Sequence, residues 1–197
     1  MGPPLTPVIL DGAHVRLAPL EPAHLDALCA AGLDPALWTL ALARMTSRDD
    51  MRRYVDEALA ERARGTALPF VQIERATGRI VGSTRLGSYD RRHRRVEIGW
   101  TWIARPWQRT PVNTEAKRLL LAHAFDQLHA MRVEFKVDAL NERSRAAVRR
   151  LGAVEEGTLR RHMITDAGRV RDTVYFSIVA DEWPAVRAGL DARLARA

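Results

Sequence analysis

The sequence contains little cysteine and lysine and has no long apolar run. Cys29 is the single cysteine, so an internal disulfide and a cysteine-rich metal site are both excluded. No uninterrupted apolar stretch approaches the ~20 residues that a membrane span needs. Residues 1–12 also lack the charged start, apolar run and cleavage site of a secretory signal peptide. We therefore expect a cytoplasmic protein with no membrane partner.

Positive charge is carried almost entirely by arginine, because Lys117 and Lys136 are the only lysines among 31 basic residues. With 24 acidic residues the net charge is +7, which attracts anionic partners to the surface. The arginines are scattered rather than gathered in a basic arm, so a nucleic-acid partner is the minority interpretation. The six histidines show no spacing suited to zinc, and neither a Walker loop nor a Rossmann glycine pattern occurs. We expect no metal site.

Hydrophobic periodicity predicts an α+β protein. Residues 1–11 are proline-rich and predict a loosely ordered lead-in. A strand and two helices should follow, the second helix beginning at Ser47 with Asp50 completing a capping box. The remaining expected elements, in order, are strands at 69–74, 80–89 and 94–103, a helix ending near 128, a strand at 132–139, a helix capped by Asn141, a hairpin of 154–164 with 170–179, and a C-terminal helix at 181–197.

This order predicts one domain over residues 1–197, with a central mixed, mostly antiparallel sheet of about seven strands flanked by helices. Within the strand at 94–103, alternation predicts that Val96, Ile98, Trp100 and Trp102 share one face, with Glu97 on the opposite face. The tryptophans are expected in the core, although Trp38 could instead line a pocket for a substrate.

The segment before the long helix has the features of an anion site. Thr110 and Pro111 suit the cap and the first position of a helix. The unpaired N–H groups and the dipole at a helix start bind phosphate groups. An ordinary Thr-Pro helix start explains the same residues and is favoured when this segment is taken alone, so both interpretations stay open at this point.

Several segments, taken together in order, carry a family resemblance. They are Val96-Glu97-Ile98-Gly99-Trp100, the run from Pro106 to Lys117, the run from Asn141 to Ala147, Leu151-Gly152-Ala153, and Glu155-Glu156-Gly157 with Arg160. This set resembles the ribosomal-protein-alanine N-acetyltransferase (RimJ/RimL-like) branch of the GNAT superfamily. The resemblance implies a GNAT fold and direct transfer of an acetyl group from acetyl-CoA to a primary amine, either a protein N-terminus or a small amine.

The resemblance also implies that Ser144 would act as general acid. It does not supply a general base, and Glu97, on the strand face opposite the tryptophans, is the candidate for that role, with His162 or a water molecule as alternatives. Plain structural roles remain open beside these: a helix cap for Asn141, a first-turn polar residue for Ser144, and an ion pair with an arginine for Glu97. The expected cofactor-binding residues are Trp102, Ile103, Gln108, Arg109, Thr110, Val112, Asn113, Thr114, Asn141 and Arg149.

The sequence departs from the family pattern at three positions that matter. The pattern Gln-x-x-Gly-x-Gly/Ala has Pro111 and Asn113 in place of its two small residues, and Val148 stands where many relatives have a tyrosine. These departures leave room for a second hypothesis, a GNAT-like module that binds acyl-CoA or nucleic acid without turnover. A homodimer is also conceivable from the resemblance, while the amine acceptor is not specified by it.

Overall fold

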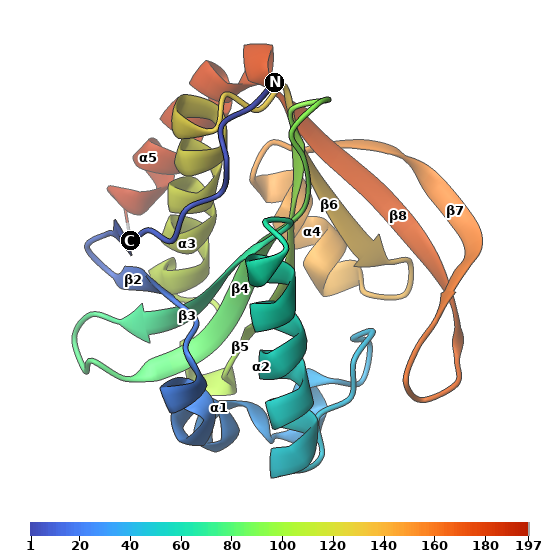
Figure 1. The fold of residues 1–197 in the computed structure, drawn as a ribbon. Helices are drawn as coiled ribbons and strands as arrows, with labels where there is room; N and C mark the ends of the chain where they lie inside the picture. Colours follow the sequence, from blue (N-terminus) through green and yellow to red (C-terminus); the bar gives the residue numbers. More distant parts are fainter. Residues whose placement is uncertain (197) are drawn as a thin grey trace.

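The computed structural model describes residues 1–196 and has a single eight-stranded sheet at its centre (Figure 1). The strand order is β1-β2-β3-β4-β5-β6-β8-β7, and every neighbouring pair is antiparallel except β5 with β6. The predicted α+β class is confirmed, with β1 as a strand beyond the seven expected. The strands are β1 Leu10–Asp11, β2 Val15–Pro19, β3 Leu68–Glu74, β4 Ile80–Asp90, β5 Arg95–Ile103, β6 Arg132–Asp138, β7 Val154–Ile164 and β8 Val170–Val179.

Five α-helices flank the sheet. They are α1 Leu25–Gly32, α2 Arg48–Ala63, α3 Pro111–Ala122, α4 Glu142–Arg150 and α5 Trp183–Leu194. The predicted capping box of α2 is present, with Ser47 and Asp50 each accepting from the other's backbone N–H. The predicted helix end near 128 is a π-helical turn, His123–Gln127, which continues α3. None of the helices in residues 1–196 combines the length and apolarity needed to cross a bilayer.

Each face of the sheet carries its own apolar core. On one face α3, α4 and α5 contribute Leu120, Val148 and Leu190 to a cluster that includes Phe176 of the sheet. On the other face, α1 and α2 pack Leu28, Met51 and Val55 against the sheet. The helices α1 and α2 cover the β2–β5 half of their face, and Figure 1 shows the β7–β8 hairpin projecting away from them. The helix-free half of that face therefore carries polar side chains.

A β-bulge in β5 overturns the predicted alternation. The register with β4 shifts between the pairs Ser83–Trp102 and Arg85–Gly99, and Trp100 has a φ of 51°. Val96 and Ile98 therefore belong to the α3-side core, whereas Trp102 belongs to the α1–α2-side core. The predicted shared face was wrong because one inserted residue reverses the direction of every side chain beyond it.

The proline-rich segment at residues 1–11 lies against the sheet. The N–H of Gly2 donates to the carbonyl of Arg91 at 2.8 Å, and the hydroxyl of Tyr89 donates to the carbonyl of Pro3 at 2.8 Å. Leu5 and Val8 pack against the α3-side core. These contacts hold the segment on the sheet, although its sequence has no regular period.

Candidate active site

The parallel strands β5 and β6 separate soon after they meet. They pair only where Arg95–Glu97 faces Arg132–Glu134, although β5 continues to Ile103 and β6 to Asp138. Beyond Glu97 the two facing strand edges have no ladder with each other, so backbone N–H and C=O groups there remain available to an extended ligand. The divergence thus opens the sheet at the ends of two strands that lead into α3 and α4.

The start of α3 lies at the end of β5 and has no side-chain cap. Thr110 is the N-cap residue as predicted, but its hydroxyl donates to the carbonyl of Trp107 at 2.7 Å instead of accepting from the helix. Pro111 has no N–H, and the next two amides, of Val112 and Asn113, precede the first intrahelical hydrogen bond. Two free N–H groups at the positive end of the helix dipole remain.

Basic side chains surround this helix start. Arg109 adopts a left-handed φ of 64°, and the next residue, Thr110, has an extended backbone conformation before the helix begins. An open hollow of about 290 Å³ lies against the turn, lined by Arg109, Thr110, Pro111, Thr114, Arg193 and Leu194. Arg193 comes from α5 and had not been singled out from the sequence, because only the packing of α5 on α3 brings it here. The amides and two guanidinium groups suit a phosphate or diphosphate.

Gln108 links the end of β5 to the first turn of α4. Its Nε2 donates to the carbonyl of Ile103 at 2.9 Å, and its Oε1 accepts from Nη1 of Arg143 at 2.8 Å. Arg143 belongs to the first turn of α4 and was not among the predicted site residues. The contact places the beginnings of α3 and α4 side by side, and it occupies the Ile103 carbonyl that a ligand arm was expected to use.

On α4, the predicted cap is confirmed. The side chain of Asn141 accepts from the N–H of Ser144 at 3.0 Å, which explains Asn141 as a helix cap. Ser144 is half-buried in the first turn of the helix. Arg149 forms an ion pair with Glu155 and lies 5.7 Å over the ring of Phe176. These partners hold Arg149 toward β7 and β8, whereas Arg143 reaches the α3 start.

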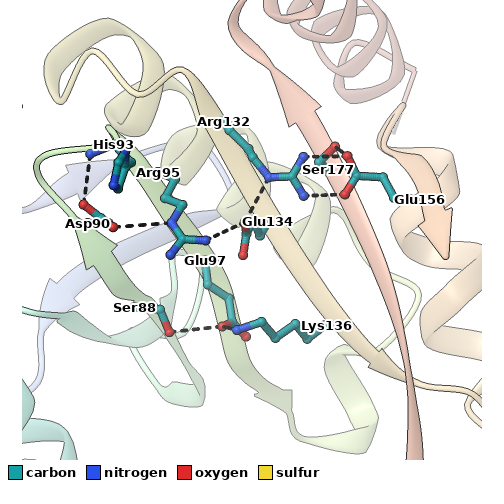
Figure 2. Close-up of polar contacts among 10 residues, drawn as sticks. All are labelled: Ser88, Asp90, His93, Arg95, Glu97, Arg132, Glu134, Lys136, Glu156 and Ser177. Atoms are coloured by element: carbon teal, nitrogen blue, oxygen red, sulfur yellow. Dashed lines mark hydrogen bonds and ion pairs between the residues drawn. The ribbon is translucent and has the colours of Figure 1, made fainter. Parts of the chain in front are cut away.

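Glu97 lies at the last paired position before the strands diverge. Figure 2 shows its carboxylate between Ser88 and Lys136, with Oε2 at 3.2 Å from the Ser88 hydroxyl and at 2.7 Å from Nζ of Lys136. Glu97 is 7% exposed, so its carboxylate is buried, and its partner is the half-buried Lys136, not the arginine considered from the sequence. Burial acts to lower the pKa of Lys136, but the hydrogen bond and charge of Glu97 outweigh it and raise that pKa.

A ladder of ion pairs continues from Glu97 across the helix-free part of the sheet. Arg132 lies between Glu134, at 2.9 Å, and Glu156, and the hydroxyl of Ser177 donates to Glu156 at 2.8 Å (Figure 2). The hydrogen bonds that Arg132 donates to Glu156 raise the pKa of Arg132 above its ordinary value. Arg95 is a second cation beside Glu134, at 3.8 Å, so the three carboxylates Glu97, Glu134 and Glu156 face the three cations Lys136, Arg95 and Arg132.

Lys117 is a buried amine that sequence reasoning missed. Its Nζ lies 2.6 Å from Oγ1 of Thr101, in the bulged part of β5, and Thr101 is hydrogen-bonded to Thr84 at 2.8 Å. Burial lowers its pKa to about 7. In the sequence, Lys117 looks like an ordinary polar position of an amphipathic helix, and no local signal indicates that it faces the sheet.

Two remaining candidates lie elsewhere. Trp38 is 8% exposed, donates from Nε1 to the carbonyl of Gly32 at 2.7 Å and packs 5.6 Å from the ring of Trp102, so it is a core residue. His162 is exposed and lies edge-on to Tyr175, with ring centroids 5.8 Å apart. Within residues 1–196 no three His, Cys, Asp or Glu side chains are grouped as metal ligands.

The fold and the diverging strands agree with a comparison to protein families. The model of the acetyltransferase (GNAT) domain matches residues 14–154, and the chain belongs to this family. The matched region contains the bulge, the α3 start, Asn141 and Ser144. The predicted family is therefore confirmed.

Several similar proteins come from bacteria. The chain is 36% identical over 106 residues to Bacillus subtilis YdaF, which is named a ribosomal N-acetyltransferase, and the match covers 54% of this chain and 57% of YdaF. The chain thus spans a little over half the length of the curated relatives it matches. A GCN5-related N-acetyltransferase from Brucella melitensis is 32% identical, with a TM-score of 0.90 over 98% of this chain and 88% of that one. Mycobacterium smegmatis RimJ in complex with CoA-disulfide is 27% identical, with a TM-score of 0.79 over 98% and 93%.

Proposed function

We propose that this protein transfers an acetyl group from acetyl-CoA directly to a primary amine, which is either a protein N-terminus or a small amine. The observation that carries the proposal is the pair of diverging strands that ends at an uncapped helix start flanked by Arg109 and Arg193. This arrangement offers an extended edge and an anion site in one line, as an acyl chain attached to a diphosphate requires. The CoA-disulfide named in the RimJ structure supports the same ligand class.

In this proposal the amides of Val112 and Asn113 and the guanidinium of Arg109 hold the diphosphate. Thr110 and Thr114 line the same hollow, and Gln108 orients the turn and occupies the Ile103 carbonyl. The remaining backbone groups of β5 at Trp102 and Ile103 pair with the acyl arm. The loss of one N–H at Pro111 is offset by Arg193. Asn141 keeps the start of α4 in position, and Arg143 replaces Arg149 as the arginine that faces this region.

The reaction needs a proton removed from the amine and a proton returned to the departing thiolate. We assign the second task to Ser144, whose hydroxyl lies in the first turn of α4. We assign the first task to Glu97, acting directly or through a water molecule, because it is the last paired residue of β5 before the divergence.

The proposal is tested by measuring release of free CoA thiol from acetyl-CoA over a panel of amines, including peptides with free N-termini, amino acids and polyamines. We expect release that depends on the amine, and a rise in melting temperature on adding CoA alone. Thermal stabilisation without release for any amine would instead favour a non-catalytic acyl-CoA-binding module. If neither occurred at saturating CoA, the proposed ligand would be wrong.

A further inference from the structure

Arg171 is a buried cation without a matching acceptor. It lies on β8, its side chain is 8% exposed, and its Nε–H is buried with no hydrogen-bond partner among the described residues. The nearest carboxylate oxygen in an ion pair with it, Oδ2 of Asp138, is 3.9 Å away, which is beyond hydrogen-bond length. Burying a guanidinium without a hydrogen-bond acceptor destabilises the fold, and a bound anion would remove this cost by accepting from Arg171.

Asp138 cannot supply that completion, because its oxygens already have other partners. Oδ2 accepts from Arg169, and Oδ1 accepts from the N–H of Leu140 at 3.0 Å. One carboxylate thus faces two guanidinium groups. Burial lowers the pKa of Arg171, although the charge of Asp138 acts in the opposite direction. Glu97 and Lys136 neutralise each other, and Asp138 neutralises one of Arg169 and Arg171. These five side chains together therefore have one positive charge in excess.

The excess charge lies on the sheet face that continues beyond the point where the strands diverge. In the register of β6 with β8, Lys136 faces Tyr175 and Asp138 faces Thr173, so Arg171 is on the same face as these residues and as Glu97. Glu97 and Tyr175 are both close enough to influence the charge of Arg171. The cation therefore lies on the same face of the sheet as the carboxylate to which we assign the acceptor's proton.

The surrounding backbone keeps this region in place. Asp166, at the tip of the β7–β8 hairpin, donates its N–H to the carbonyl of Leu42 at 3.0 Å, and its carboxylate accepts from the N–H of Arg44 at 3.0 Å. The hairpin that carries Arg171 is thereby fixed to the segment between α1 and α2. Arg171 thus lies on a hairpin whose tip is held in place by the chain at Leu42 and Arg44.

We propose that Arg171 binds a carboxylate of the amine acceptor, so that the preferred acceptors carry a carboxylate close to their amine. This inference rests on the proposed function and specifies its substrate class. The carboxylate can belong to a free amino acid or to an acidic side chain at the N-terminus of a peptide, and both have the same chemistry at Arg171. A carboxylate neutralises the excess charge and accepts charge-assisted hydrogen bonds, whereas a cationic acceptor is repelled.

The test compares acceptors that differ only in this group. Alanine is paired with 2-amino-1-propanol, and the peptide Asp-Ala-Ala-amide with Asn-Ala-Ala-amide, and kcat/KM is measured at matched concentrations of neutral amine. We expect the carboxylate to raise kcat/KM by about 10-fold to 100-fold in at least one pair, as expected for charge-assisted hydrogen bonds. The pair that responds identifies the source of the carboxylate. Equal kcat/KM within both pairs overturns the inference.

Variants assign the effect to this side chain. Arg171→Gln should reduce the ratio within the responding pair to about 1 without changing the KM for acetyl-CoA, and Arg171→Lys should keep part of the ratio. Arg160→Gln, which removes an exposed arginine of the same hairpin, is the matched control and should keep the full ratio. A full ratio in folded Arg171→Gln overturns the inference, and if that variant does not fold, the ratio in Arg171→Lys decides.

The inference and the proposed function fail in different ways. If no amine of any kind releases CoA, the proposed function is wrong. If neutral amines are acetylated as well as their carboxylate counterparts, the transferase proposal stands and only the role of Arg171 is wrong.

Discussion

Lys117 shows how one side chain can act against the stability of the fold around it. The chain has only two lysines, and this one is buried beneath the bulge of β5, where two threonine hydroxyls contact it and its pKa falls to about 7. In the unfolded chain the same amine would have its ordinary pKa of 10.5. Between these two values the unfolded state binds a proton that the folded state does not, so stability should rise with pH.

Replacing Lys117 with Met should therefore stabilise the protein at pH 7 and lose most of that advantage near pH 10. The pKa difference corresponds to at most about 4 kcal/mol at pH 7. Urea unfolding at pH 7 and pH 9.5 measures it, with Arg150→Met, at an exposed position of α4, as control. If wild type and Lys117→Met showed the same pH dependence, the amine would be charged in the folded state and the burial argument would be wrong.

Substitutions of Glu97 and Ser144 should differ in how their effect on the rate depends on pH. If Glu97 removes the acceptor's proton, Glu97→Gln should lower kcat/KM most at low pH, because at high pH the amine loses its proton without help. The loss should be about 100-fold or more at low pH and shrink as pH rises. Ser144→Ala should lower the rate by a similar factor at all pH values. Glu134→Gln, at the facing position of β6, is the control, and a Glu97→Gln profile parallel to wild type would remove Glu97 from proton transfer.

At the scale of elements, the start of α3 concentrates the features on which the proposed cofactor binding depends. Its cap residue directs its hydroxyl away from the helix, its first residue lacks an N–H, and the amides that follow are free. An anion binds such a helix start more tightly when a basic side chain lies beside it. Arg109, which has a left-handed backbone conformation, provides that side chain.

Arg109→Gln should consequently raise the KM for acetyl-CoA by about 10-fold, with a small effect on kcat, because a charge-assisted hydrogen bond to the diphosphate is lost in ground state and transition state alike. Steady-state kinetics with acetyl-CoA as the varied substrate measures this. Arg105→Gln, four residues earlier and exposed, should leave the KM unchanged. An unchanged KM in Arg109→Gln would mean that the diphosphate lies elsewhere.

At the scale of the whole molecule, one buried carboxylate of α3 connects this helix to the first strands of the sheet. Glu115 of α3 accepts hydrogen bonds from the N–H groups of Ala13, His14 and Val15 at 2.8, 2.6 and 2.8 Å. A Cβ at Gly12 would lie 2.3 Å from the Glu115 carboxyl carbon, so only glycine fits beside it. The contact spans about a hundred residues of sequence and holds α3 in place against β2.

Glu115→Ala should lower the free energy of unfolding by about 3 kcal/mol, because three N–H groups at a partly buried turn lose a charged acceptor. Chemical denaturation measures the change. Glu142→Ala, which removes an exposed glutamate that pairs with Arg145, should cost less than about 1 kcal/mol. Equal losses in the two variants would show that Glu115 has no special structural role.

Local sequence alone determined most elements and their ends. The capping box of Ser47 and Asp50, the Asn141 cap and the hairpin turn at Gly168, with its φ of 79°, each depend on groups within a few residues of one another. The resemblance in the ordered motifs identified the family for the same reason, since those motifs are contiguous. The element order then predicted the sheet class.

Only the tertiary structure decided the bulge at Trp100, the burial of Lys117, the pairing of Glu97 with Lys136, and the unmatched charge of Arg171. Each depends on strands or helices that are distant in the chain and meet only in the folded sheet, where a one-residue shift reverses a side chain and a missing neighbour leaves a charge without a partner. Such contacts have no period or spacing in the sequence, because the groups that set their energies come together only on folding.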